Sequence, residues 1–504
     1  MLAWTIYLSF AGALIQALLP KGRNSLARWL ALAFAVLGLL HGVGGFVQGV
    51  GQGRIVIVDL PWVPSMGIHY LLAADGISRV LVLLTGLAAV AGVLFSWNID
   101  VRTNEFFAFY LALIGGVYGV FLSFDLFLLF VFYEIAIVPK YFLIAIWGST
   151  RREYGAMKLA LYSFVGSAMV LIGLLAVYTT AGSHSTSMID LAHANLPASF
   201  QMWCFPLVFT GFAILAGMWP FHTWAPTGHV AAPTAASMLL AGVVMKLGAY
   251  GCLRVGIWLL PHGLDPWGFS LLGIGSWRDV FALLAIIGIV YGALVALAQT
   301  DFKFVIGYSS VSHMGFVLLG LMTLNKIGVT GAVLQMFSHG VIAGLLFAIV
   351  GRIVYERTHT RQLAELETMH LARRLPFAAW AFVIAGMASM GLPGFSGFVA
   401  ELQVLVGAWM VKPWWTVAAG VGIVVGVAYT WRALQKAFFS DHLPTAHTLE
   451  QEREPGHQFA AITWPEITGV VMLTGVTLFV GLCPKIFLET IEPAVKALLA
   501  GGGQ

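Results

Sequence analysis

Five ionisable side chains lie deep inside long apolar stretches, where a charge is costly. Glu134 lies about ten residues from either end of FDLFLLFVFYEIAIVPKYFLIAIWG, and Lys246 lies inside TAASMLLAGVVMKLGAYGCLR. Glu401, His313 and His339 occupy similar positions in GLPGFSGFVAELQVLVGAW, YSSVSHMGFVLLG and LQMFSHGVIAGLL. A carboxyl or amine in such surroundings is cheapest in its neutral form, and histidine titrates near neutral pH. The pattern is typical of a relay that moves protons; its alternative is a set of neutral, hydrogen-bonded packing residues.

Three further side chains have two interpretations each. Lys140, in VPKYF, either extends its amine to the cytoplasmic side or stays over a turn from Glu134 and modulates that carboxyl. His222 and His229 lie in GMWPFHTWAPTGHVAAP, where each is either a relay group or a hydrogen-bonded core residue. The sequence leaves these alternatives open.

The elements that position these residues are predicted to be transmembrane helices. The chain has 504 residues, of which 60% are hydrophobic and 10% are charged, whereas soluble domains carry about 25% charged residues. The fold class is therefore an all-α polytopic membrane protein. Windows of about 20 apolar residues predict fourteen spans, near 2–19, 26–48, 76–97, 105–122, 125–147, 156–180, 203–220, 233–258, 279–298, 304–323, 328–351, 376–410, 414–437 and 466–485.

Two of the predicted helices are broken. Three prolines interrupt 217–233, and GLPGFSGF interrupts 391–398. Irregular backbone at membrane depth is tolerated only inside protein or beside water-filled cavities. Breaks in two corresponding segments favour an inverted-repeat transporter, with ordinary kinks or interhelical loops as the alternative.

Lysine and arginine gather after the odd-numbered helices, so these loops are predicted to be cytoplasmic and both termini to lie outside. Two loops are long: 49–75 on the outer side and 438–465 on the cytoplasmic side. The second is acidic and rich in histidine, with Asp441, His442, His447, Glu450, Glu452, Glu454 and His457. Met1–Pro20 has neither a basic region nor a small-residue cleavage site, so we interpret it as the first span.

Other classes of function have no support in the sequence. The net charge is only +4 and no basic run suggests a nucleic-acid partner. Cys204, Cys252 and Cys483 are scattered, so we expect three small buried residues and no zinc or iron–sulfur site. Walker A and dinucleotide-binding motifs are absent, so no bound nucleotide is expected.

Several long motifs resemble the chain M family of bacterial NADH:quinone oxidoreductase, the counterpart of chain 4 of mitochondrial complex I. They are QTDFKFVIGYSSVSHMGFVLLGL, FHTWAPTGHVAAPTAASMLLAGVVMKLGAYG, RTHTRQL and GLPGFSGFVAE, within a similarity that spans about 106–439. The resemblance implies fourteen helices with two inverted five-helix repeats, helices 4–8 in 105–260 and helices 9–13 in 261–437. Helices 1–3 then occupy 1–104, and a cytoplasmic loop and helix 14 occupy 438–504.

The resemblance also implies a function. It predicts a proton-pumping, antiporter-like subunit of a respiratory complex in a bacterial plasma membrane, with lipid and neighbouring antiporter-like chains as partners. It implies no cofactor on this chain, because FMN, iron–sulfur clusters and quinone belong to partner subunits. The alternatives are a subunit of an Mrp-type cation/proton antiporter and a scaffold subunit that transports nothing. RTHTRQL and the fit of the HMGF segment favour the first interpretation.

By motif position, Glu134 resembles the family's fifth-helix glutamate, Lys246 its central lysine and Glu401 its terminal glutamate near the outer side. His313 and His339 resemble its connecting histidines. This sequence departs from the pattern at two positions: Leu215 replaces a lysine that usually precedes the first break, and Lys140 replaces a methionine. We hypothesise that Lys140 supplies the lost cation. The competing hypothesis is a variant that pumps fewer protons or none.

Overall fold

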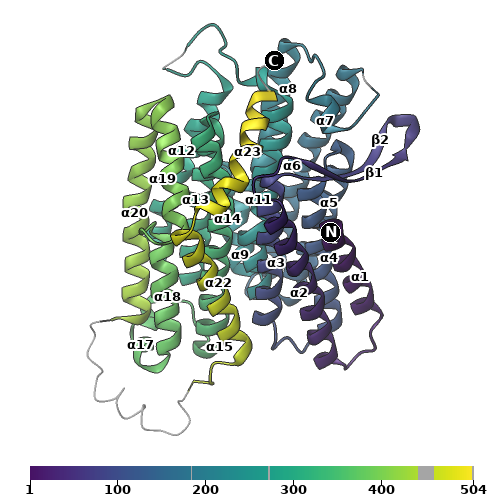
Figure 1. Ribbon diagram of the computed structural model, residues 1–504. Helices are drawn as coiled ribbons and strands as arrows, with labels where there is room; N and C mark the ends of the chain where they lie inside the picture. The colour runs from purple at the N-terminus through teal and green to yellow at the C-terminus, as the bar shows by residue number, and fades with distance from the viewer. Residues whose placement is uncertain (183, 271–272, 441–458, 502–504) are drawn as a thin grey trace.

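The computed structural model describes residues 1–182, 184–270, 273–440 and 459–501, and it forms a bundle of long helices (Figure 1). Twelve of the described helices are long and apolar enough to cross a membrane. The shorter α1 (Ala3–Leu18) and the broken pair α18 (Pro376–Ser389) and α19 (Ser396–Val411) complete the fourteen predicted spans. The acidic, histidine-rich residues Asp441, His442, His447, Glu450, Glu452, Glu454 and His457 lie outside the described residues.

The helices before the first break follow the predicted windows closely. They are α2 (Asn24–Gln48), α3 (Gly76–Phe95), α4 (Thr103–Leu122), α5 (Leu126–Trp147), α6 (Arg152–Ala181), the short α7 (Met188–Leu191) and α8 (Ala198–Ala216). The next span joins α10 (Thr234–Leu239), the π-helical turn η3 (Leu240–Val244), α11 (Met245–Gly251) and the π-helical turn η4 (Cys252–Ile257), and a short η5 (Pro261–Leu264) follows.

The second half continues in the same way. Its helices are α12 (Trp277–Ala298), α13 (Phe302–Met322), α14 (Lys326–Ala348) with the π-helical η6 (Ile349–Val354), α15 (Tyr355–Thr358), α16 (Leu363–Glu367), α17 (Leu371–Arg374) and α20 (Pro413–Phe438). Loops that contain Arg102, Arg151 and Arg361 meet at one end of the bundle, the end where Figure 1 shows α15: the Trp147 side chain donates to the Val101 carbonyl, the Ser149 amide to the Ala231 carbonyl, and Arg361 to the Val230 carbonyl. We call this the basic end.

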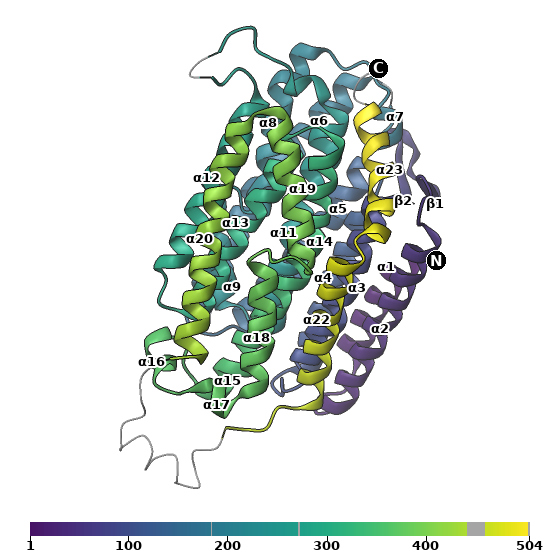
Figure 2. The ribbon, with the colours of Figure 1, turned by 60° about the vertical axis from the view of Figure 1, so that its left-hand side comes forward.

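Both predicted helix breaks are present. α8 stops at Gly217, whose φ of 82° is easy only for glycine, and the chain resumes in η2 (Phe221–Thr223) and α9 (Trp224–Ala231). α18 stops before Gly391 and Gly394, which have φ of 71° and 98°. The two broken helices run in opposite directions, since α8 leads down to α9 and α18 leads up to α19 (Figure 2). This arrangement accords with inverted repeats.

The outer loop predicted for 49–75 contains a β-hairpin that the all-α expectation missed. β1 (Ile55–Val63) pairs antiparallel with β2 (Ile68–Ala74), and η1 (Pro64–Met66) with Gly67 makes the turn. β1 is rich in β-branched residues, which favour extended backbone. The buried Arg79 fixes the base of the hairpin by donating a 2.7 Å hydrogen bond to the Gly49 carbonyl.

The C-terminal part also extends beyond the predicted last span. α22 (Trp464–Leu482) is followed by a further helix, α23 (Lys485–Gly501), that packs on α3 and α14. Pro484 separates them because proline cannot continue a helix with a backbone donor. Cys483, at this junction, is exposed, so the expectation that all three cysteines are buried was wrong for this residue; Cys204 and Cys252 are buried.

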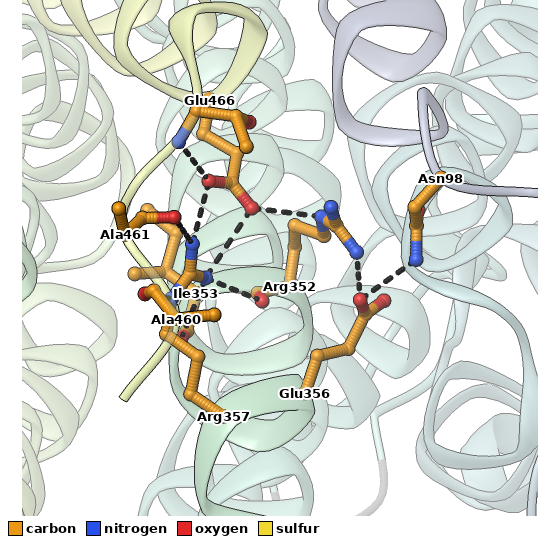
Figure 3. A network of polar contacts seen from close by, with 9 residues as sticks. Asn98, Arg352, Ile353, Glu356, Arg357, Ala460, Ala461 and Glu466 are labelled. Carbon is orange, nitrogen blue, oxygen red and sulfur yellow. Dashed lines mark hydrogen bonds and ion pairs between the residues drawn. The ribbon is translucent and has the colours of Figure 1, made fainter. Parts of the chain in front are cut away.

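Glu466 fastens the start of α22 to the basic end (Figure 3). Its carboxylate is buried between two arginines, with 2.8 Å from Oε1 to Arg352 Nε and 2.8 Å from Oε2 to Arg357 Nη2. Arg352 also pairs with Glu356, which accepts a 2.7 Å hydrogen bond from Asn98. The network therefore joins η6 and α15 to α22 and to the loop after α3.

A buried ion pair joins α3 to η4 at the opposite end of the bundle. Arg254 Nη2 lies 2.5 and 2.6 Å from the two carboxylate oxygens of Asp75, and the guanidinium packs against the rings of Phe124 and Tyr250. Asp75 also caps α3 by accepting a hydrogen bond from the Ser78 amide at 3.0 Å. Removing one partner of such a pair leaves an uncompensated buried charge.

Asp75→Asn should therefore destabilise the bundle strongly, by about 3–5 kcal/mol, although asparagine keeps the helix cap. The measurement is the thermal unfolding midpoint of the purified protein in mild detergent. Asp100→Asn is the matched control, because Asp100 pairs with Arg28 while 72% of its side chain is exposed. Equal midpoints for Asp75→Asn and the control would show that the buried pair contributes nothing to stability.

Candidate functional site

Lys246 is fully buried near the middle of its span. It lies on α11, between the π-helical turns η3 and η4, where the wider helix frees backbone groups from the regular α ladder. Its amine Nζ donates to the Ala241 carbonyl in η3 and lies 2.9 Å from Nδ1 of His339 on α14. The predicted central amine is therefore held by one acceptor that cannot titrate and one ring that can.

Two histidines continue from this amine. The rings of His339 and His313, on α14 and α13, have centroids 5.3 Å apart. His313 Nδ1 then lies 2.9 Å from Glu401 Oε1 on α19. All four residues, including Lys246, are buried, with no more than 9% of their surface exposed. The structure thus brings four of the predicted residues, from four different helices, into one continuous line.

Two residues that the sequence analysis missed complete the far end of the line. Gln335 donates from Nε2 to Glu401 Oε1 at 3.1 Å, and the Ser389 hydroxyl lies 3.3 Å from His313 Nε2. Gln335 lies four residues before His339, so the helical period could have placed both on one face of α14. The sequence gives no comparable signal for Ser389, because burying a single hydroxyl in an apolar helix costs little free energy.

The second helix break lies directly beside Glu401. A Cβ atom on Gly391 would lie 2.9 Å from Glu401 Oε2, so an added methyl group would require the carboxyl to shift. A small cavity of about 10 Å³, lined by His313, Ser389, Glu401 and Tyr429, adjoins the carboxyl. That volume admits about one water molecule.

A larger cavity of about 200 Å³ opens at the basic end, lined by Lys303, Glu356, Arg361 and Asn98 among others. Lys303, at the start of α13, is buried, and its amine donates to the carbonyls of Ala232 at 2.7 Å and Val230 at 3.3 Å. These carbonyls end α9, where helical carbonyls lack partners and attract cations.

His229 lies between this cavity and the central amine. Its ring is fully buried on α9, within electrostatic reach of both Lys303 and Lys246, and it packs against Phe347. Neither ring nitrogen has a hydrogen-bond partner among the described residues. A buried polar ring left unpaired in this way is costly unless water reaches it.

Glu134 and Lys140 form a second group, between α5 and α6. Lys140 is 1% exposed and donates to the Ser163 hydroxyl at 3.1 Å. The interpretation in which it extends to the cytoplasmic side is therefore wrong. Its charge interacts with that of Glu134, although no ion pair within 4 Å joins these two described residues. Among the described residues, no hydrogen bond or ion pair joins Glu134 to the Lys246 line, so the two groups are separate.

His222 stands apart from both groups. It follows the first break and packs edge-on against Tyr291, with ring centroids 5.2 Å apart. Both of its ring nitrogens lack partners among the described residues. Leu215 is buried in the last turn of α8, where its backbone contacts the Gly248 position of α11.

Comparison with known proteins identifies the family. The model for the transmembrane part of NADH:quinone oxidoreductase and Mrp antiporters matches residues 123–426. The chain is 35% identical to NADH-quinone oxidoreductase subunit M of Rhodobacter capsulatus, over 98% of this chain and 95% of the relative. The chain belongs to this family. The resemblance predicted from the motifs is thereby confirmed.

The fold agrees with that assignment. A chain of respiratory complex I from Thermus thermophilus, solved with bound NADH, matches with a TM-score of 0.88 and 27% identity over 100% of both chains. A chain of the Mrp complex from Dietzia sp. DQ12-45-1b matches with a TM-score of 0.81 and 20% identity, over 99% of this chain and 97% of that one, which shows a shared fold only. The chain is thus a multi-pass integral membrane protein of the antiporter-like type.

Gly391→Ala should reduce proton translocation by the assembled complex severalfold. The new methyl would strain a backbone with positive φ and displace the Glu401 carboxyl. The measurement is dye-monitored acidification of membrane vesicles. Gly420→Ala on α20 is the control, because nothing lies within 4 Å of its Cβ position. Normal acidification by Gly391→Ala would show that proton translocation does not require the Glu401 carboxyl to occupy its present position.

Proposed function

We propose that this chain translocates protons in the membrane arm of a respiratory NADH:quinone oxidoreductase, coupled to electron transfer on other subunits. The observation that carries the proposal is the buried line from Lys246 through His339 and His313 to Glu401. A line of groups that each bind and release a proton is costly in a membrane protein and has no packing advantage over apolar side chains.

The relay has an inlet and an outlet. Protons enter through the cavity at the basic end, pass Lys303 and His229, and load the Lys246 amine. His339 and His313 then accept a proton on one ring nitrogen and release one from the other. Glu401 receives the proton beside the second break, where the small cavity holds about one water molecule. The basic end is the cytoplasmic side in this proposal.

Charge repulsion supplies the coupling between sites. Two like charges 4 Å apart repel by about 4 kcal/mol at an effective dielectric constant near 20. Protonating one member of the line therefore favours release from its neighbour. Electron transfer elsewhere in the complex provides the energy that resets the charges, while FMN, iron–sulfur clusters and quinone are bound by partner subunits.

The partners are the neighbouring antiporter-like chains of the same membrane arm. The β-hairpin offers one contact surface, because Val56, Leu60 and Trp62 of β1 are about half exposed. Exposed apolar side chains on a two-stranded sheet outside the helix bundle favour contact with another chain. Lipid covers the apolar outer faces of helices such as α20.

Two other functions compete with this proposal. A subunit of an Mrp-type antiporter would share the fold and the buried line, but it would couple to an ion gradient instead of electron transfer. The 35% identity to subunit M over nearly the whole chain favours the respiratory complex. A scaffold that transports nothing would explain Leu215, but not the retained line of titratable residues.

Lys246→Met should lower NADH-driven proton translocation by about 10²-fold, the usual contribution of a proton-transfer group. The measurement compares vesicle acidification with NADH oxidation in the same membranes that carry the assembled complex. Lys496→Met, at an exposed position on α23, is the matched control. Full translocation by Lys246→Met would overturn the proposed function, and translocation without electron transfer would support the antiporter.

Lys140 is proposed to supply the cation that Leu215 cannot. Lys140→Met should then reduce translocation by about tenfold, an effect of about 1.4 kcal/mol on the limiting step. Adding Leu215→Lys to Lys140→Met should restore part of it, because a cation returns to the position that the family usually uses. Wild-type translocation by Lys140→Met alone would contradict the compensation.

A further inference from the structure

Two serines on α6 face the charged groups of α5. Ser163 and Ser167 are both buried, and they lie four residues apart, which places their hydroxyls on one face about 6 Å apart along the helix axis. Ser163 Oγ accepts the 3.1 Å hydrogen bond from Lys140 Nζ. Ser167 lies one turn further along α6, and both Ser167 Oγ and Glu134 Oε1 are buried without a hydrogen-bond partner among the described residues.

A hydroxyl suits a group that changes its protonation state, because it both donates and accepts hydrogen bonds. Toward an ammonium it accepts, and toward a neutral amine it donates to the lone pair; toward a carboxylate it donates, and toward a carboxylic acid it accepts. A backbone carbonyl only accepts hydrogen bonds, so it can serve the ammonium and the carboxylic acid but not the neutral amine's lone pair or the carboxylate. Hydroxyls at the contact between α5 and α6 can therefore hydrogen-bond the Lys140 amine and the Glu134 carboxyl in both of their charge states, without exposing either group to lipid.

We propose that Ser163 and Ser167 are positioning residues for a proton-exchange pair formed by Lys140 and Glu134. The proton leaves the Glu134 carboxylic acid and binds the Lys140 amine, giving a carboxylate and an ammonium, and the reverse step returns it. Ser163 rotates its hydroxyl from donor to acceptor as the amine is protonated, and Ser167 makes the opposite change at the carboxyl. This inference rests on the proposed function. It names the hydroxyl groups that allow Glu134 and Lys140 on α5 to change their protonation states.

Other residues near this contact do not hydrogen-bond the Lys140 amine in the described chain. Lys158 and Tyr162, on another face of α6, contact Thr227 and Thr223 near α9 instead. Pro139 precedes Lys140 on α5 and contributes no backbone donor. Within the described part of the chain, the Lys140 amine therefore donates to Ser163 alone.

The test compares Ser163→Thr with Ser163→Val in the assembled complex. Threonine and valine have nearly the same shape and differ by the hydroxyl, so any packing defect affects both variants. Ser163→Thr should translocate protons as the wild type does. Ser163→Val should lower translocation severalfold and shift the pH of half-maximal translocation by about one unit, since it removes a hydrogen bond to a charged group. Ser167→Val should behave similarly.

Ser9→Ala is the matched control for loss of a buried hydroxyl, because Ser9 bonds only the Thr5 carbonyl of its own helix α1. It should leave the rate and the pH profile unchanged. Equal behaviour of Ser163→Thr and Ser163→Val, whether both are active or both are defective, would overturn the inference. The proposed function is tested separately, by the Lys246→Met variant.

Discussion

The structure depends on one constraint: an amine at Lys246 has no access to water or lipid headgroups, so the protein itself must satisfy it. The π-helical turn before it frees the Ala241 carbonyl, and α14 brings the His339 ring to 2.9 Å. Helices around this amine are correspondingly enclosed, with every residue of the hydrophobic windows of α3 and α14 buried. The outer helices face lipid and shield them.

The helix breaks solve the related problem of admitting water without exposing backbone to lipid. Both breaks use glycine at positive φ, at Gly217 and Gly391, so the chain turns without strain. The first break places α9, with His229, between the cavity at the basic end and Lys246. The second places Glu401 beside a water-sized cavity. In the proposed path, the two breaks therefore lie at the two ends.

Much of this architecture could be predicted because burying charge in lipid leaves a clear trace in the sequence. The spans, both breaks and the line from Lys246 to Glu401 follow from apolar windows, prolines, glycines and isolated ionisable residues. The β-hairpin could not be predicted from apolar windows, since its strands of nine and seven residues are too short to be read as spans. α23 was missed because its amphipathic sequence falls below the apolar threshold for a span.

The uncharged members of the site were also beyond the sequence. Ser163 and Ser389 carry little desolvation cost, so nothing distinguishes them from ordinary helix residues until their neighbours are known, whereas the four-residue spacing of Gln335 from His339 was a usable signal. Whether Lys140 stays buried depends on how α5 is rotated against α6, which only the packed structure determines. Cys483 is exposed because the chain leaves α22 there, a boundary that hydropathy places only within a few residues.

The most direct test of the central claim is the number of protons translocated per electron when the line is cut between Lys246 and His313. His339→Leu removes the bridging ring and leaves the other members in place, while His339→Gln keeps a polar side chain that does not titrate. The account predicts that both variants transfer electrons and assemble but translocate fewer protons per electron than the wild type. An unchanged ratio in both would contradict a continuous proton path through His339.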